Sequence, residues 1–302
     1  MKNYFFVVLL IGVAVPCHAE WRERRGALTE MHSTGEFRIF YSLSGQDALP
    51  NSADANGNGA PDYVDRVATE LAAARELYDH QLQLTHPLKS ARYNNQAEFI
   101  DVHLLSFPLT SNGAKHGIAY DELSSFERAR EPGRETKVLV MDISNALPAR
   151  NPTPAHELFH LYQNGYTLFK NRWFTEGTAR WAESLNKKGA PGAGQLPRSP
   201  AEVNDLFQKT YQAASFWTVV VNRMDPAGGG RAFIRPLFEE LGRMDDVAGA
   251  KSGQGTAKWT EKQQMSPAND AYIWKALQAT LAQSAFRQQR DADIQRLMDM
   301  KL

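Results

Sequence analysis

The sequence has almost no cysteine: Cys17 is the only one among 302 residues. Disulfide bonds between two of its own cysteines therefore cannot brace the fold. An exported protein without disulfides often uses bound metal ions instead, because a ligand that binds only the folded state stabilises that state. The shortage of cysteine therefore makes metal-binding patterns worth searching for.

The sequence also lacks an excess of charge of either sign. Its Lys and Arg residues number 34 and its Asp and Glu residues number 34, so the formal net charge is zero. Such a balance gives no general attraction to nucleic acid or to an anionic membrane surface. The sequence contains no phosphate-binding loop, no serine nucleophile elbow and no basic stripe with interleaved aromatic residues. We therefore expect neither a nucleic-acid partner nor a membrane partner for the mature chain.

The long apolar run of the sequence lies at its N-terminus. Lys2 precedes an apolar stretch at 5–15, and Ala19 is a small residue suited to signal-peptidase cleavage. The stretch is too short to span a bilayer comfortably. The proline before Cys17 is a poor fit to a lipid-attachment site. Residues 1–19 are therefore predicted to be a signal peptide, which implies a secreted or periplasmic protein.

The order of the elements that follow indicates an α+β fold, with a sheet-containing part at 20–150 and a mainly helical part at 151–302. Period-two alternation, or a high content of β-branched and aliphatic residues, predicts strands at 36–41, 99–105 and 137–142. Helical spacing of apolar residues predicts helices at 63–81, 153–165, 174–187, 203–224, 229–242, 269–286 and 288–300. The remaining segments are expected to be irregular, including a mobile entry segment at 20–35, a long connection at 106–135 and an exposed loop at 246–262.

The pentad His156-Glu157-Leu158-Phe159-His160 is predicted to lie on a helix that Thr153 caps and that has Pro154 in its first turn. Residues four apart differ by about 40° around a helix axis, so both imidazoles can reach one metal ion. Glu157 is offset by about 100° and can reach a water bound to that ion. This is the arrangement of a zinc-activated water with a carboxylate base. The alternative is two ordinary histidines on a buried helix face.

A catalytic zinc site needs a third protein ligand and one open coordination position. The candidate is Glu176, which we expect in the first turn of a helix capped by Thr175. Gly177 is small enough for another helix to approach closely. Glu183 lies on the same helix face and is expected to accept a hydrogen bond from a histidine Nδ1–H or to pair with Arg180. The alternative is that Glu176 only interacts favourably with its helix dipole.

The pentad followed by a Glu-Gly-x-Ala helix resembles the gluzincin metallopeptidases, the thermolysin-like clan. Three segments, at 54–65, 156–163 and 173–183, are similar to a group of secreted bacterial metalloproteases, and the likeness covers about residues 50–225. The resemblance implies a zincin-like arrangement, zinc at the ligands named above and peptidase activity.

The spacing departs from the thermolysin-like pattern at one place. Only 15 residues separate His160 from Glu176, which is somewhat fewer than in that pattern. The two helices are therefore expected to be joined by a tight turn through Asn164 and Gly165.

A second metal-binding pattern precedes the helix at 63–81. Oxygen-bearing residues occupy alternate positions of an EF-hand-type loop, and Gly59 supplies its bend. The proposed calcium ligands are Asp54, Asn56, Asn58, the carbonyl of Ala60, Asp62 and Asp65. No helix is predicted before the loop, so it corresponds to half an EF-hand. The alternative is an Asn- and Gly-rich turn that caps the helix.

A few other polar side chains are candidates for the same site. Tyr211 can donate a hydrogen bond to an oxyanion, although packing in the core is the favoured interpretation of this residue. His103 and His116 can each face a cleft, and a lone histidine more often has no such role. The aromatic residues Trp173, Trp181, Phe216 and Trp217 are expected in the core.

The sequence therefore predicts a secreted zinc metallopeptidase that acts on a peptide or protein by attack of a zinc-bound water, with Glu157 as base. Zinc is the expected cofactor, and calcium is a second one. Two alternatives stay open: a zinc hydrolase of a non-peptide substrate, and a non-catalytic binding module that is stabilised by metals. Neither the cleavage preference nor the oligomeric state follows from the sequence.

Overall fold

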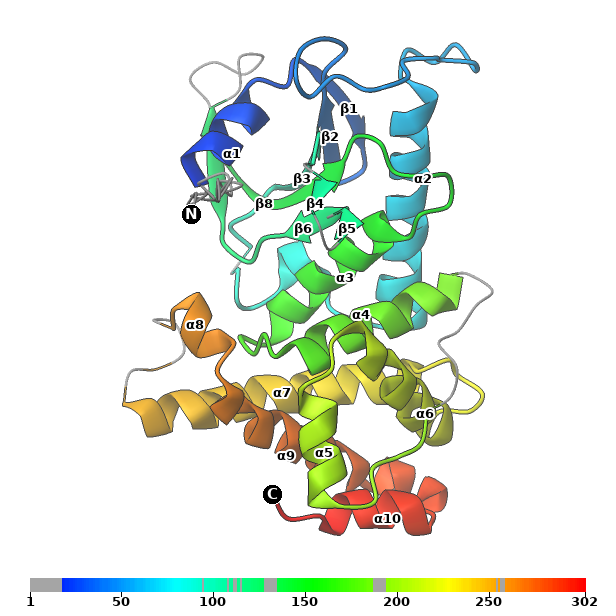
Figure 1. Cartoon of the computed structure of the whole chain (residues 1–302), viewed down its shortest axis with the longest axis vertical. Helices are drawn as coiled ribbons and strands as arrows, with labels where there is room; N and C mark the ends of the chain where they lie inside the picture. Colours follow the sequence, from blue (N-terminus) through cyan, green and yellow to red (C-terminus); the bar gives the residue numbers. More distant parts are fainter. Residues whose placement is uncertain are drawn as a thin grey trace, which may run out of the picture.

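The computed structural model describes residues 18–93, 95–107, 109–110, 113–114, 116–127, 135–186, 194–253, 255 and 259–302. The predicted signal peptide lies almost wholly outside these residues. The chain has an α+β fold, as predicted, with a sheet in its first part and helices in its second (Figure 1). Among the described helices, none combines the length and the apolar character needed to cross a bilayer.

The three predicted strands form the centre of the sheet. They are β2 (Phe37–Tyr41), β3 (Phe99–Leu105) and β8 (Glu135–Ser144), and they pair in parallel. At one edge, β1 (Glu30–Thr34) pairs antiparallel with β2. The described order is β1-β2-β3-β8-β6, where β6 is Gly117–Ala119, and β7 (Ser124–Glu127) also pairs with β8.

The expected irregular connection at 106–135 contains strands, so that prediction is wrong. Both β6 (Gly117–Ala119) and β7 (Ser124–Glu127) pair antiparallel with β8, and β4 (Leu109–Thr110) forms a small hairpin with β5 (Gly113–Ala114). Each is at most four residues long, so none is long enough to show clear period-two alternation. The strand β6 lies beside the pentad helix and bears directly on the site.

The entry segment also has regular structure, which corrects the expectation of a mobile 20–35. It contains α1 (His18–Gly26) and then β1. The guanidinium of Arg25 is buried against Asp142 of β8, with Nε 2.8 Å from Oδ1. The neighbouring Arg24 is buried against Asp47. Arg25 thus anchors α1 to the outer face of the sheet, and Arg24 anchors it to the loop after β2.

The inner face of the sheet carries the main hydrophobic core. Alternate residues of β3, such as Ile100 and Val102, join the inner faces of α2 (Asp62–Glu76) and α3 (Thr153–Tyr166) in one buried cluster. The predicted helix at 63–81 is confirmed, and its last residues form a π-helical turn at Leu77–Gln81. The helix α3 therefore lies between the sheet-containing part and the helices below it (Figure 1).

The helical part departs from the predicted boundaries at several places. The predicted helix at 269–286 ends at Leu281 and is followed by a 3₁₀ helix at Ser284–Gln289. The expected helix at 203–224 is divided by a 3₁₀ turn at Tyr211–Ala213, because Thr210 has a non-helical backbone with φ −120° and ψ −111°. The helix α7 continues through Ser252 into the expected loop at 246–262 and ends at Gly253, whose φ of 71° terminates it. The helices beyond α3 are α4 (Arg172–Asn186), α5 (Pro200–Phe207), α6 (Ala214–Met224), α7 (Arg231–Ser252), α8 (Glu261–Gln264), α9 (Asp270–Leu281) and α10 (Ala292–Asp299).

Aromatic residues fix α4 against the helices below it. Trp173 and Trp217 are fully buried and stack with their ring centroids 5.5 Å apart. The Trp173 indole N–H donates to Asp270 of α9 at 2.7 Å. A Cβ on Gly177 would lie 2.8 Å from the Trp217 ring, so the close helix approach expected at this glycine is confirmed. Substitution of Gly177 would push α4 and α6 apart.

The connection between α3 and α4 is longer than the expected tight turn at Asn164 and Gly165. The helix α3 continues through Tyr166, and residues 167–171 make the connection. Gly165 lies inside this helix, and its missing side chain leaves room for Ser90, whose Cβ lies 3.1 Å from the position of an added Cβ. Asp245 of α7 then holds the connection by accepting the Leu168 N–H at 2.7 Å.

This buried aspartate makes the free energy of unfolding depend on pH. Burial raises the pKa of Asp245 to about 6, and the charge of Asp246 adds to this, although hydrogen bonds from Leu168 and Thr167 and the charge of Arg92 oppose it. Between about pH 4, the ordinary Asp pKa, and pH 6, the folded state keeps a proton that the unfolded state has lost. Asp245 therefore reduces the free energy of unfolding as the pH rises through this window.

We expect Asp245→Asn to remove this pH-dependent loss of stability, because the amide oxygen can still accept a hydrogen bond from the Leu168 N–H without carrying a charge. At pH 7.5 the variant should be more stable than the wild type by about 1–3 kcal/mol, and near pH 4 the difference should vanish. Urea unfolding of both metal-free proteins at the two pH values measures this. An equal difference at both pH values would contradict the assignment.

Candidate metal centre

The pentad helix begins where the sequence predicts, although by a different cap. Pro152 is the N-cap residue of α3, and the Thr153 side chain does not cap the helix as expected. Instead, Oδ1 of Asn151 accepts the Thr153 N–H at 3.0 Å and its hydroxyl at 2.7 Å. Pro154 lies in the first turn, as predicted. The helical geometry then puts His156 and His160 on one face, with their ring centroids 4.6 Å apart.

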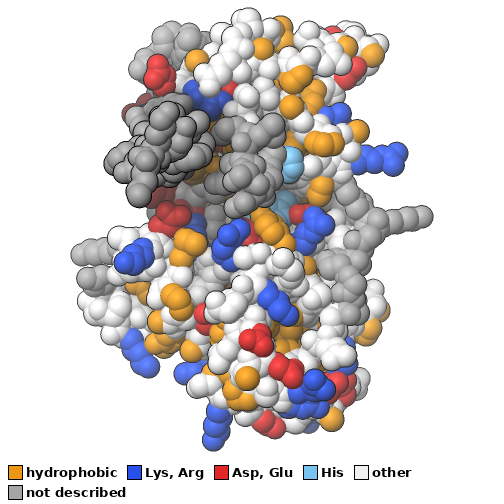
Figure 2. All heavy atoms as spheres, in the orientation of Figure 1, with side chains coloured by type: hydrophobic (Ala, Val, Ile, Leu, Met, Phe, Trp, Pro, Cys, Tyr) orange, Lys and Arg blue, Asp and Glu red, His pale blue; other side chains and the backbone are white. Residues whose placement is uncertain are grey.

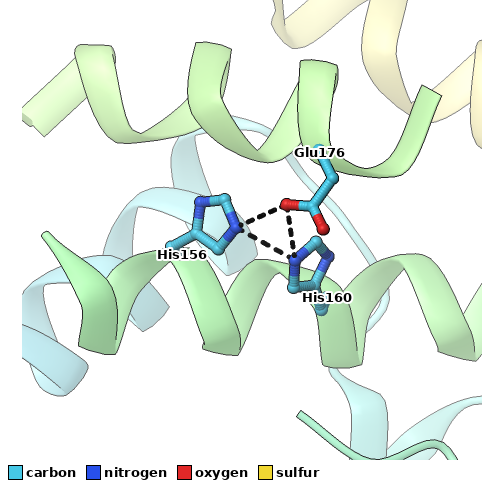
Figure 3. Close-up of side chains that lie close together, drawn as sticks. All are labelled: His156, His160 and Glu176. Atoms are coloured by element: carbon cyan, nitrogen blue, oxygen red, sulfur yellow. Dashed lines mark hydrogen bonds and ion pairs between the residues drawn. The ribbon is translucent and has the colours of Figure 1, made fainter. Parts of the chain in front are cut away.

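The structure brings the three predicted zinc ligands together (Figure 3). The Nε2 atom of His156 lies 3.2 Å from Oε2 of Glu176 and 3.0 Å from Nε2 of His160. The Nε2 atom of His160 lies 3.7 Å from the same Glu176 oxygen. Ligand atoms about 2.0–2.1 Å from a tetrahedral zinc ion are about 3.3–3.4 Å apart, so the three observed distances bracket what zinc requires. The donor set of two imidazoles and one carboxylate is also that of catalytic zinc.

Glu176 projects from α4 toward α3 (Figure 3). The helix begins at Arg172, so Glu176 lies in its second turn, and the expected cap at Thr175 is wrong because Thr175 is already inside the helix. Helix-dipole effects fall off within the first turn. The alternative that Glu176 serves only its helix dipole therefore loses its basis. The other oxygen, Oε1, lies 3.5 Å from the Arg172 guanidinium.

Glu183 makes both contacts that were expected of it as alternatives. Its Oε1 lies 2.5 Å from Nδ1 of His156, and its Oε2 accepts from the Arg180 guanidinium at 2.6 Å. Burial lowers the pKa of His156, but hydrogen bonds to Glu176 and Glu183 outweigh this and raise the pKa to about 10. Near neutral pH the metal-free His156 therefore carries a proton on both ring nitrogens. A metal ion would displace the proton on Nε2, and Glu183 would keep the proton on Nδ1.

His160 has a partner that the sequence analysis missed. Its Nδ1 lies 2.6 Å from Oε1 of Gln163, which is buried with 1% of its surface exposed. Residues three apart are neighbours on a helix surface, so the spacing of His160 and Gln163 was a usable signal.

Glu157 lies beside the cluster and against the edge strand β6. Its side chain is buried, and a Cβ on Gly117 would lie 2.6 Å from its Cγ and 2.9 Å from its Oε1. Burial raises the pKa of Glu157, although the charges of His160 and His156 and a backbone hydrogen bond at Ala119 oppose this shift. The absence of a side chain at Gly117 is therefore what allows the strand to lie against this carboxylate.

Tyr211 lies at the site rather than in the core, so the favoured interpretation of this residue is wrong. Its side chain is 47% exposed, and its ring centroid lies 5.8 Å from that of His156. Burial of the hydroxyl raises the pKa of Tyr211 to about 12, and the nearby carboxylates of Glu176 and Glu157 add to the shift. The break in the predicted 203–224 helix is what places Tyr211 here.

The two other histidines lie outside the cluster. His103 is fully buried on β3, where its Nδ1 lies 3.2 Å from Asp142. His116 is exposed and directly precedes β6. Side chains alternate along a strand, so the side chain of His116 lies on the same face of the sheet as that of Tyr120. The Tyr120 hydroxyl donates to Asp142 on the outer face, so His116 points away from α3.

The predicted calcium loop is a closed turn before α2. Asp54 accepts the backbone N–H groups of Gly57 and Gly59 at 2.8 and 2.9 Å. The amides of Asn56 and Asn58 both donate to Asp65 at 2.8 Å. The last two predicted ligands are Asp62, which accepts the Ala55 N–H at 2.9 Å, and Ala60, which is buried. The oxygen-rich residues thus converge, and calcium binding stays a prediction.

Histidine side chains are visible from outside at the level where the sheet-containing and helical parts meet, with acidic and basic side chains around them (Figure 2). His160 and Glu176 are partly exposed, so a solvent-borne metal ion can reach them. Comparisons with protein-family models, with curated proteins and with solved structures found no match to this chain.

We expect Glu176→Gln to weaken zinc binding by more than about 100-fold, because it removes the anionic ligand. Loss of a ligand should cost more affinity than loss of an outer hydrogen-bond partner, which typically costs 10–100-fold. Competition with a chromophoric chelator measures the affinity. The matched control is Glu239→Gln, which removes an exposed carboxylate paired with Arg235 on α7. Equal affinities in the two variants would show that Glu176 is not a ligand.

Proposed function

We propose that the chain is a zinc-dependent peptidase. The observation that carries the proposal is the convergence of His156, His160 and Glu176, whose ligand atoms all lie within 4.8 Å of one another, with the buried carboxylate of Glu157 beside them. Three protein ligands with a partly exposed face leave room for a fourth, non-protein ligand, which is the difference between catalytic and structural zinc sites.

The residues divide the chemistry between them. Bound zinc supplies a Lewis acid and lowers the pKa of its water to about 7. With the metal held by His156, His160 and Glu176, Glu157 would take a proton from the water as the water oxygen adds to the scissile carbonyl carbon. It would return that proton to the amine nitrogen as the C–N bond breaks. The burial that raises the pKa of Glu157 favours the proton-carrying form that the second step requires. The Tyr211 hydroxyl, which interacts with Glu176, would donate a hydrogen bond to the developing oxyanion.

The edge strand β6 supports a peptide as the substrate. The Ser144 N–H donates to the carbonyl of His116, and the Tyr120 N–H donates to the carbonyl of Val140. Antiparallel pairing alternates along a strand, so Gly117 and Ala119 direct their backbone groups away from β8 and toward the site. The Ala119 N–H donates to Glu157, and the other backbone groups of this edge face the site. An extended peptide can pair with such an edge. A polysaccharide offers no matching row of amides and carbonyls, so this edge favours a peptide over the non-peptide alternative.

Two further elements of the proposal rest on the sequence. Export from the cytoplasm rests on the signal-peptide pattern at 1–19. Calcium at the loop from Asp54 to Asp65 would stabilise the start of α2, which packs on α3. The non-catalytic alternative, a module stabilised by metals, differs from the peptidase in one respect: it does not need Glu157.

We therefore expect Glu157→Gln to keep zinc bound and to reduce peptide hydrolysis by about 10²–10⁴-fold, because the variant cannot move the proton. Zinc content and cleavage of a peptide library measure the two properties on the same preparation. Hydrolysis at the wild-type rate in the variant would remove Glu157 from the mechanism. A wild-type protein that binds zinc and cleaves no peptide would favour the other two functions.

Gly117→Ala tests the contact between β6 and Glu157. The added methyl group would lie 2.6 Å from both Cγ of Glu157 and Cγ2 of Thr153, so one of them must move. A displacement near 1 Å at a reacting group costs about 100-fold in rate, so we expect a loss of that order in kcat. Zinc affinity should stay the same because Glu157 is not a ligand. The control is Gly26→Ala, whose Cβ meets open space, and equal kcat values in the two variants would contradict the contact.

A further inference from the structure

Gln163 links the two helices that carry the metal ligands. It lies on α3, three residues after His160, and its Oε1 contacts Nδ1 of that histidine at 2.6 Å. Its Nε2 donates to two oxygens of α4: the carbonyl of Thr175 at 2.9 Å and the hydroxyl of Thr178 at 2.6 Å. The side chain is almost completely buried, so these contacts are shielded from water.

The partners on α4 determine which way the amide of Gln163 points. The Thr175 carbonyl can only accept a hydrogen bond. The Thr178 hydroxyl already donates to the carbonyl of Phe174 at 2.8 Å, so it also accepts from Gln163. The NH₂ group of the amide must therefore face α4, and its oxygen must face His160.

We propose that Gln163 is a positioning residue that imposes one tautomer on His160. An amide oxygen can only accept, so the Nδ1 of His160 must carry the proton, and the Nε2 lone pair is then directed at Glu176 and His156. The same amide ties this orientation to α4 beside the third ligand. The inference deepens the proposed zinc site and depends on that site for its functional meaning.

The choice of an amide has an electrostatic reason. His156 has a carboxylate partner, Glu183, and the centre also contains Glu157 and Glu176. A fourth carboxylate at 163 would put a negative oxygen 2.9 Å from the Thr175 carbonyl, where Gln163 now donates. The neutral amide orients His160 and satisfies α4 without adding charge. Outer partners of this kind typically change metal affinity by 10–100-fold.

The tautomer can be measured directly in the metal-free protein by long-range ¹H–¹⁵N correlation of the histidine rings, at a pH where His160 is neutral. We expect the Nδ1–H form for His160 in the wild type. In Gln163→Leu, which has no polar partner, we expect the Nε2–H form to appear and the Kd for zinc to rise by 10–100-fold. A wild-type His160 with its proton on Nε2 would overturn the proposal by itself, even if the leucine variant failed to fold.

Thr178→Val separates orientation of His160 from the bridge between the helices. It removes one α4 partner of Gln163 and leaves the contact to His160, so we expect the wild-type tautomer and a Kd within about threefold of wild type. A Kd shift as large as that of Gln163→Leu would mean that the bridge matters and the tautomer does not. If zinc did not bind the wild type, the proposed function would fail, while the tautomer measurement would still decide the role of Gln163.

Discussion

The separation of α3 and α4 is the constraint on which the candidate site depends. Two of the ligands come from α3 and the third from α4, so a shift of one helix by an ångström would take Glu176 out of reach of the histidines. Gly177 allows α4 to contact Trp217, and Trp173 ties α4 to Asp270. These contacts are 40 or more residues apart in the sequence. The ligand triangle is therefore a property of the whole helical part, and a short motif accounts for only one side of it.

Local patterns predicted those features of the site that are themselves local. The pentad, its helix and the shared face of its histidines follow from a period of 3.6 residues, and the strands at the centre of the sheet follow from their buried aliphatic side chains. Glu183 could be assigned because it lies seven residues from Glu176 on one helix. The structure also gives it both expected partners, His156 and Arg180.

Features that depend on distant residues were not predictable in the same way. The segment at 20–35 was expected to be mobile because the buried partners of Arg24 and Arg25 lie 23 and 117 residues away. Tyr211 was interpreted as a core residue because the sequence around it shows a continuous helical pattern. In the structure a turn interrupts that helix and exposes the residue. The strand β6 is only three residues long, so no periodicity could reveal it. Both Tyr211 and β6 flank the candidate metal ligands, so the least predictable elements are those that border this site.

The buried position of Arg25 limits how far the N-terminus of the chain can be shortened. Asp142, at the centre of the outer sheet face, is fully buried and contacts Arg25, His103 and Tyr120. Loss of one partner of a buried ion pair leaves the other charge uncompensated, at a typical cost of 3–5 kcal/mol. Trimming by a host protease, or an expression design that starts after α1, would therefore damage the strand that pairs with β6. The first helix is thus an integral part of the folded protein.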